Sequence, residues 1–499
     1  MNALSRRQLF GAAGAAAAAF SFGPEVWAEA KDRLVIGISL EPPVLDPTKN
    51  AAAAIRSLTC PNVFESLGRI NRNGDIVKGL AESWTISSDG KEYVFKLLKG
   101  VKFHDGEMLD ASVVKFSLDR LFAADSTAPG KALYTDIDKV EAVDPSTVKV
   151  TLKSPNSYML YNLSLGDAGV MHPKSAATND KHPIGTGPFA FKERKEGDSI
   201  TLAKASTYRD PAAIKLNTVI YKVVKDPSAQ VSALLAGDID AFPGFQAPEL
   251  VERIKKDQRF VVVVGTTEGE VILATNNGKK PFDDLRVRQA MAHAINRKEL
   301  IDAESGYGTP IGSFFPPHNK AYIDLTGTYP LDIAKAKALL KEAGHPNGFE
   351  ASLKLPPVGY AQRAGEVIAA QMAKIGIKIA ITQLQWPQWL AEVFKGKNYD
   401  LTIVAHTEAN DLDRYARDDY YWNYHSDAFK AKWKQVIEAT DFAMRDELLK
   451  DCQRIIAKDA VNGYLYQLAK IGVWKKDLVG MWENAPTPSD YLAVVHWKA

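Results

Sequence analysis

The stretch LAESWTISSDGKEYVFKLLKGVKFHDG, residues 80–106, decides the fold of this chain. Apolar and polar residues alternate over residues 93–97, which is typical of a half-buried strand. Asp105-Gly106 is typical of a hairpin turn, and we prefer this interpretation to a catalytic His104–Asp105 pair. A helical run at residues 111–121 and a second alternating run at 148–152 follow. Together these patterns predict a mixed α+β subdomain over about residues 55–182.

On both sides of this subdomain, strands alternate with helices. A β-rich run at residues 33–39 ends in Glu41-Pro42-Pro43, and loops at strand ends are where ligand sites lie in α/β sheets. Glu41 is therefore a candidate ligand contact. Downstream, residues 218–224 predict a strand and 226–236 a helix with Asp226 as its N-cap. The apolar strand at 261–264 is a candidate crossing between two lobes.

A second α/β region follows, and it indicates a sheet covered by helices on both faces. Apolar residues at three- and four-residue spacing predict helices over residues 284–303, 331–343 and 361–375. Strands are expected at 377–381 and 399–404, separated by an aromatic turn at 386–389. Residues from about 471 onward indicate strand and turn, so the tail is free to return to the first region.

The composition of the chain argues against several classes of function. The chain has 499 residues, 62 Lys+Arg and 60 Asp+Glu, so its formal charge of +2 predicts no nucleic-acid partner. Two cysteines, at positions 60 and 452, form neither a CxxC pair nor a zinc-ligand pair. No GxSxG or HExxH motif is present, which argues against a secreted hydrolase and for a protein that is not an enzyme.

The N-terminus indicates export. Ser5-Arg6-Arg7-Gln8-Leu9-Phe10 is a twin-arginine pattern, and a short apolar stretch and Ala28-Glu29-Ala30 follow it. We interpret residues 1–30 as a removable signal for the twin-arginine route, in preference to a signal anchor or a buried helix. No cysteine lies near the cleavage point to accept a lipid, and no later window is long and apolar enough to span a bilayer. The mature protein is expected to be soluble in the periplasm, without a lipid anchor.

Several motifs, in one order along the chain, resemble the family 5 extracytoplasmic solute-binding proteins, the receptors of peptide and nickel ABC importers. They are NVFESL at 62–67, LAESW at 80–84, VKFHDG at 101–106, GTGPF at 185–189, GDID at 237–240, PFDDLRVRQA at 281–290 and AKALLKEAG at 336–344.

The resemblance implies an α/β fold: a two-lobed periplasmic-binding-protein clamshell of type II, with the extra α+β subdomain inserted in lobe I. It implies lobe I over residues 31–268, lobe II over 269–470 and a return to lobe I over 471–499. A disulfide between Cys60 and Cys452 would lock such a clamshell, so we expect two free, buried thiols.

The resemblance also implies a function. A monomeric receptor would capture a peptide or a related amino-bearing solute between its lobes, close on it, and deliver it to an inner-membrane ABC permease, with no cofactor or metal. The alternative within the same role is an opine, an oligosaccharide or a nickel chelate.

Site residues follow from matching one loop of lobe II. In peptide-binding members an acidic residue after the last lobe II strand pairs with the ligand's ammonium group, which places Glu408 there, with Asp411 next. A calcium site in this acidic loop lacks the EF-hand spacing. The arginine that binds the peptide carboxylate in dipeptide receptors is absent, so either the ligand is not a simple dipeptide or another arginine replaces it: Arg363, Arg414 or Arg417. Three nearby aromatic residues are candidates for stacking on a ligand, although packing explains them too: Trp386, Trp389 and Tyr415.

Overall fold

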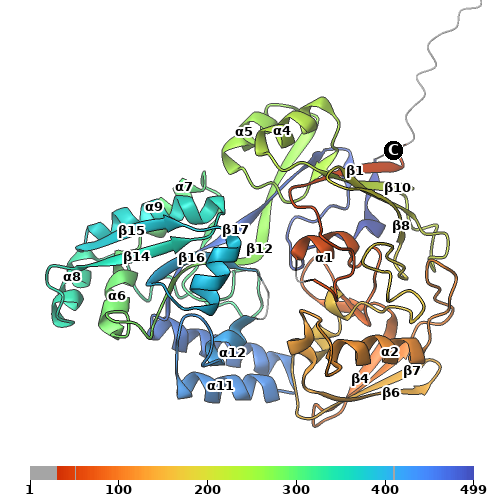
Figure 1. The fold of residues 1–499 in the computed structure, drawn as a ribbon, viewed down its shortest axis with the longest axis horizontal. Helices are drawn as coiled ribbons and strands as arrows, with labels where there is room; N and C mark the ends of the chain where they lie inside the picture. Colours follow the sequence, from red (N-terminus) through yellow and green to blue (C-terminus); the bar gives the residue numbers. More distant parts are fainter. Residues whose placement is uncertain (1–30, 51, 408–410, 499) are drawn as a thin grey trace, which may run out of the picture.

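The computed structural model describes residues 31–50, 52–407 and 411–498, and it shows two lobes joined by long strands (Figure 1). The main sheet has eleven strands, ten of them in the order β15-β14-β16-β12-β17-β11-β1-β10-β9-β8, with β13 paired to β17. Their bounds are β1 Arg33–Ile38, β8 Phe189–Lys195, β9 Ser199–Lys204, β10 Thr218–Val223, β11 Ala241–Phe242, β12 Phe260–Thr275, β13 Thr309–Pro310, β14 Phe349–Leu355, β15 Ile377–Gln383, β16 Leu401–His406 and β17 Asn462–Lys475.

The two longest strands, β12 and β17, pass from one lobe to the other. The first half of β12, to Thr266, pairs with the second half of β17, which also pairs with β11 of the first lobe. From Glu270 onward β12 pairs with the first half of β17 and with β16 of the second lobe. The ladder is interrupted between Thr266 and Glu270, so both crossings occur at one irregular point. The strand expected at 261–264 is thus part of a longer crossing strand. The predicted boundary at 268/269 falls in this interruption and that at 470/471 falls inside β17, and both stay predictions.

Residues 80–106 supply two strands, β4 and β5, of a separate sheet of order β4-β5-β7-β6, which is covered by α2 (Ala111–Phe122). Its strands are β4 Ala81–Ile86, β5 Glu92–Leu97, β6 Ile137–Asp144 and β7 Thr147–Leu152. Asp110 caps α2 by accepting from the backbone N–H of Ser112 and Val113. His104 bonds to the Gly187 carbonyl (3.0 Å) and accepts from the Gly185 N–H, so it anchors a turn. The mixed α+β character of this part of the chain is confirmed, and the bounds at about residues 55–182 stay a prediction.

The remaining short strands and the helices complete both lobes. The short strands are β2 Gly68–Ile70, β3 Ile76–Lys78, β18 Leu478–Val479 and β19 His496–Trp497. The remaining α-helices are α1 Ala53–Thr59, α3 Met159–Asn162, α4 Pro227–Ala236, α5 Val251–Lys255, α6 Leu285–Ala294, α7 Arg297–Ala303, α8 Ile333–Glu342, α9 Gly359–Ala373, α10 Trp386–Trp389, α11 Asp427–Glu438 and α12 Phe442–Lys458. Six short 3-10 or π segments have the bounds Lys131–Tyr134, Gly166–Ala168, Pro248–Leu250, Leu390–Lys395, Asp411–Ala416 and Leu492–Val494.

Two expectations for the second lobe are wrong. The single helix expected over 284–303 is broken into α6 and α7, because Ile295 and Asn296 are extended and the Asn296 side chain caps α7. The aromatic turn expected at 386–389 is helical: α10 continues into a π-helical segment, Leu390–Lys395.

A second contact joins the lobes away from the crossing strands. The segment after β7 reaches α11, where the Ser157 N–H donates to the Ile437 carbonyl (2.9 Å) and the Ser157 hydroxyl to the Val436 carbonyl (2.8 Å). The Tyr158 ring stacks on Trp433 at 5.9 Å, and the Arg445 guanidinium lies 5.2 Å from the same ring. Tyr158 therefore belongs to the core of the second lobe, although its chain neighbours belong to the first.

Candidate functional site

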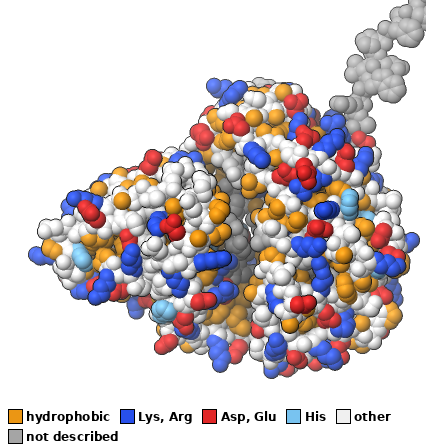
Figure 2. All heavy atoms as spheres, viewed as in Figure 1, with side chains coloured by type: hydrophobic (Ala, Val, Ile, Leu, Met, Phe, Trp, Pro, Cys, Tyr) orange, Lys and Arg blue, Asp and Glu red, His pale blue; other side chains and the backbone are white. Residues whose placement is uncertain are grey.

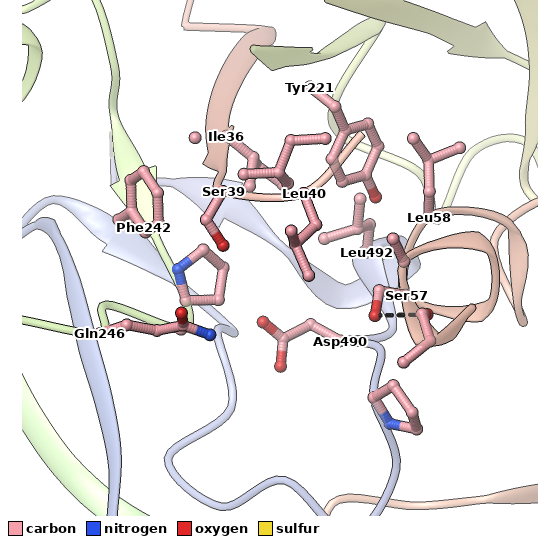
Figure 3. A pocket seen from close by; sticks show the side chains of 17 residues that line it. Ile36, Ser39, Leu40, Ser57, Leu58, Tyr221, Phe242, Gln246, Asp490 and Leu492 are labelled. Atoms are coloured by element: carbon pink, nitrogen blue, oxygen red, sulfur yellow. Dashed lines mark hydrogen bonds between the residues drawn. The ribbon is translucent and has the colours of Figure 1, made fainter. Parts of the chain in front are cut away.

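The surface is hollowed between the two lobes (Figure 2). In the first lobe, a cavity of about 270 Å³ lies where β1 ends. Four segments distant in sequence meet there, together with Tyr221 of β10: the end of β1, α1, the loop after β11 and the C-terminal segment (Figure 3). The lining residues are Ile36, Gly37, Ile38, Ser39, Leu40, Ala53, Ala54, Ser57, Leu58, Tyr221, Phe242, Pro243, Gly244, Gln246, Pro488, Asp490 and Leu492.

Local sequence explains the shape of this cavity. Beyond β1 the chain reaches Pro42 and Pro43, neither of which can donate a backbone N–H, and Leu40 is left 68% exposed at the rim. Gly37 is required for packing, because a Cβ there would lie 2.3 Å from the Phe242 ring. The Tyr221 side chain is buried at the wall, and burial raises the pKa of its phenol.

One buried carboxylate lines the cavity, and it comes from the C-terminal segment. The Asp490 side chain is 7% exposed, and Lys470 of β17 donates to its Oδ1 (3.2 Å) and to the Trp482 carbonyl (2.7 Å). Burial raises the pKa of Asp490, and Lys470 opposes that shift. The two charges therefore stabilise each other at the wall of the cavity.

Glu41, a candidate from the sequence, lies beside this region but not among the lining residues. Its carboxylate accepts from the Arg194 guanidinium (2.7 Å) and from the Gly197 N–H (3.1 Å). Burial alone would raise the pKa of Glu41, but these bonds outweigh it and the pKa is lowered. In this conformation Glu41 fastens the loop after β1 to the β8–β9 hairpin.

The second-lobe loop after β16 carries the other acidic candidates. Glu408 lies outside the described residues, and Asp411 begins a 3-10 turn without a described side chain. Beside them, the Arg414 guanidinium donates to the Tyr420 hydroxyl (2.7 Å) and lies 5.4 Å from the Tyr420 ring. It also contacts His406 Nδ1 at 3.2 Å. A cation is therefore held at the base of the acidic loop.

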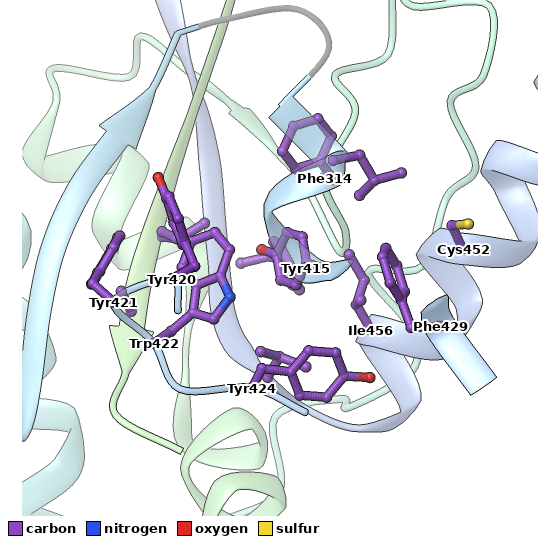
Figure 4. Packing of buried hydrophobic residues seen from close by; sticks show 14 of the residues in the cluster. Phe314, Tyr415, Tyr420, Tyr421, Trp422, Tyr424, Phe429, Cys452 and Ile456 are labelled. Atoms are coloured by element: carbon purple, nitrogen blue, oxygen red, sulfur yellow. Dashed lines mark hydrogen bonds between the residues drawn. The ribbon is translucent and has the colours of Figure 1, made fainter. Parts of the chain in front are cut away.

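The three aromatic candidates differ in exposure. Tyr415 is 1% exposed in an aromatic cluster (Figure 4), and its ring stacks on Trp422 at 4.4 Å. Its hydroxyl bonds to Asn462 Nδ2 and to the Tyr464 hydroxyl, each at 3.0 Å. Trp389 is also buried, and its indole N–H donates to the Thr402 hydroxyl. Trp386, 41% exposed, is the accessible member of the three.

Arg363 and Arg417, considered for a ligand carboxylate, each pair with an acidic residue of the chain. Arg363 makes a bidentate pair with the buried Glu304, at 2.9 and 2.6 Å. Arg417 pairs with Asp413. A solute carboxylate would have to compete with these partners.

The two cysteines do not form a disulfide with each other. Cys60 and Cys452 are free and buried as expected, and burial raises the pKa of each thiol to about 12. Among the described residues, no cluster of three or more His, Cys, Asp or Glu side chains could hold a metal ion. Over the same residues, no helix combines the length and apolar character of a membrane span.

Two lobes, two crossing strands and a cavity at a strand end are the architecture of a periplasmic solute-binding protein. The model of "Bacterial extracellular solute-binding proteins, family 5 Middle" matches residues 75–431, and the chain belongs to this family, whose members are the substrate-binding components of ABC transporters.

The "Glutathione-binding protein GsiB" of Pectobacterium atrosepticum is 35% identical over 387 residues, covering 76% of this chain and 74% of the relative. A periplasmic binding protein DppA from Helicobacter pylori, solved with the peptide STSA, superposes with a TM-score of 0.80 at 26% identity, covering 94% of this chain and 98% of that one. AgaA from A. tumefaciens R10, solved with agropinic acid, gives a TM-score of 0.78 at 26% identity, covering 94% and 99%.

Sequence reasoning did not find Asp490 or Gln246 as lining residues of the cavity. Neither stands in a recognisable motif, and each reaches the cavity only because its segment returns to β1 from far along the chain. The one available signal was the expected return of the tail to the first lobe.

Proposed function

We propose that this protein captures a peptide or a related amino-bearing solute between its lobes in the periplasm and delivers it to an inner-membrane permease. One observation carries the proposal: the fold leaves, at the end of β1, a cavity with a mainly apolar lining and a few polar groups, which is how small-solute sites are built. The names of the relatives, a glutathione-binding protein and a peptide complex, support the ligand class.

A thermal-shift screen tests this proposal. The probes are glutathione, the peptide Ser-Thr-Ser-Ala, agropinic acid, an oligosaccharide and a nickel chelate. A ligand at a hundredfold excess over its Kd stabilises the native state by roughly 2.7 kcal/mol, which a melting curve detects. We expect glutathione or the peptide to raise the Tm and to be recovered intact, as fits a receptor without enzymatic activity. If only the sugar or the chelate raises it, the peptide class is wrong.

An opine is the second candidate ligand, because AgaA binds agropinic acid and is similar along nearly its whole length. An opine joins an amino-acid moiety to a second polar arm, so it suits the same mixed lining. Agropinic acid in the screen separates the two classes: a Tm shift with this probe alone favours the opine.

Export by the twin-arginine route belongs to the same proposal, as does a monomeric protein without a lipid anchor. Replacing Arg6 and Arg7 together with lysine keeps the charge and removes the recognised pair. Fractionation should find the wild-type protein in the periplasm, shortened by its signal, and the double variant in the cytoplasm at full length. Periplasmic recovery of the variant would exclude this route.

A further inference from the structure

Asp490 is held rigidly at the wall of the cavity by residues that do not belong to the cavity. The buried side chain of Asn62 donates from Nδ2 to the Asp490 carbonyl (3.0 Å) and accepts at Oδ1 from the Leu492 N–H (3.0 Å). Lys470 fixes the carboxylate itself. Because contacts from two distant segments hold Asp490 and a third holds Leu492 beside it, the carboxylate is preorganised rather than free to turn away.

The carboxylate keeps unused capacity to accept hydrogen bonds. An ionised carboxylate has about four lone-pair positions, of which Lys470 occupies one at Oδ1 and the Trp482 backbone N–H another, so about two remain. In Figure 3 the carboxylate points toward the side-chain amide of Gln246 on the opposite wall, with apolar side chains around both. A buried carboxylate of this kind is stabilised by any further donor that enters the cavity.

We infer that Asp490 is a specificity-determining residue of the solute site: its carboxylate accepts a hydrogen bond from an N–H or ammonium group of the solute, whose apolar part packs on Leu40 and Phe242. The cavity volume, about 270 Å³, is just below the usual range of roughly 300–1,000 Å³ for whole ligands. The first lobe therefore receives one arm of the solute. The ligand class is a peptide-like molecule with an apolar arm that ends in a nitrogen donor. This inference rests on the proposed function.

The simpler alternative is that the Lys470–Asp490 pair only fastens the C-terminal segment to β17. D490N keeps the size of the side chain and an oxygen for Lys470 while removing the negative charge, and because Lys470 then lacks its partner, a melting curve of the ligand-free variant must first show that it is folded. The control is D477N, which removes an exposed carboxylate that lies 3.9 Å from Lys31, away from the cavity.

The experiment uses the mature protein, exported from cells that express the full chain, in three forms: wild type, D490N and D477N. Each is incubated with glutathione, with Ser-Thr-Ser-Ala and with the small-molecule fraction of a bacterial periplasm, then washed and denatured, and the released molecules are measured by mass spectrometry. A lost hydrogen bond to a charged group should lower the retention of the nitrogen-bearing solute by about tenfold or more in D490N. D477N should retain as much as wild type.

Equal retention by D490N and wild type overturns the role of Asp490 and leaves the receptor function standing. No retained solute on wild type overturns both. A crystal structure of the loaded wild-type protein covers the case in which D490N does not fold. A solute nitrogen within about 3.2 Å of an Asp490 oxygen supports the inference, and a solute without a donor at that oxygen refutes it.

Discussion

Charged side chains near the cavity pair with protein groups of opposite charge. Arg194 holds Glu41, and Lys470 holds Asp490. Removing one member of such a pair leaves the other uncompensated, so substitutions here change stability as well as binding. The acidic loop after β16 carries Glu408, which lies outside the described residues, so its role as a ligand contact is a prediction from the sequence.

Replacing Glu408 with glutamine tests that assignment. The variant keeps the shape of the side chain and loses one charged hydrogen bond to an ammonium group, so an amino-bearing solute should bind more weakly by about 1.5–3 kcal/mol. Calorimetric titration with the solute found in the thermal screen measures the change. Glu82→Gln, at an exposed position of β4, is the matched control. Unchanged affinity would transfer the assignment to Asp411 or to backbone carbonyls.

The residues that cap the helices decide where several of them begin and end. The break between α6 and α7 depends on Asn296, whose side chain accepts from the N–H groups of Lys298 and Glu299 while its backbone bonds to the Gln371 side chain. Asn296→Ala should lower the free energy of unfolding by about 1 kcal/mol, because the first turn of α7 loses its cap. Denaturant unfolding followed by circular dichroism measures this loss. Asn296→Ser keeps an oxygen that can cap α7, and it loses the bond to Glu299 just as Asn296→Ala does, so it should be more stable than the alanine variant; an equal loss in both variants would contradict the capping argument.

The same helix ends show what the sequence could predict. The helix expected at 226–236 is confirmed as α4, because Asp226 and Gly237 act through bonds to their immediate neighbours and through the positive φ of Gly237. Asn296 lies within an apolar pattern that continues through residues 284–303, so the periodicity predicted one helix there and gave no sign of the cap. Asp490 could not be predicted as a lining residue, because its position depends on Asn62 and Lys470, whose contacts form only in the folded chain.

Among the described residues, the lobes are connected by the crossing strands and by several side-chain contacts, which include the Lys320–Asp75 ion pair (2.7 Å) and the Lys255–Tyr307 hydrogen bond (3.0 Å). Both crossing strands change lobes at the interrupted ladder between Thr266 and Glu270, which is where a hinge rotation can occur with little loss of pairing. A further contact is the packing of Tyr158 on Trp433 of α11, beside the Ser157 hydrogen bonds to the same helix. This apolar packing opposes separation of the lobes on the Tyr158 side.

Tyr158→Ala should therefore widen the motion of the ligand-free protein. The substitution removes the stacked ring and the surface on which Arg445 lies, so the contact between this segment and α11 keeps its Ser157 hydrogen bonds but loses its apolar packing. Spin labels, one on each lobe, should give a broader and longer distance distribution by pulsed electron resonance than in wild type. Tyr158→Phe is the matched control, because among the described residues the Tyr158 hydroxyl has no hydrogen-bond partner and its removal costs nothing at this contact.

Since capture needs the lobes to close around the solute, a wider open state should also lower the apparent affinity of Tyr158→Ala while leaving that of Tyr158→Phe unchanged. Identical distance distributions in all three proteins would show that the packing of Tyr158 on Trp433 does not limit the motion.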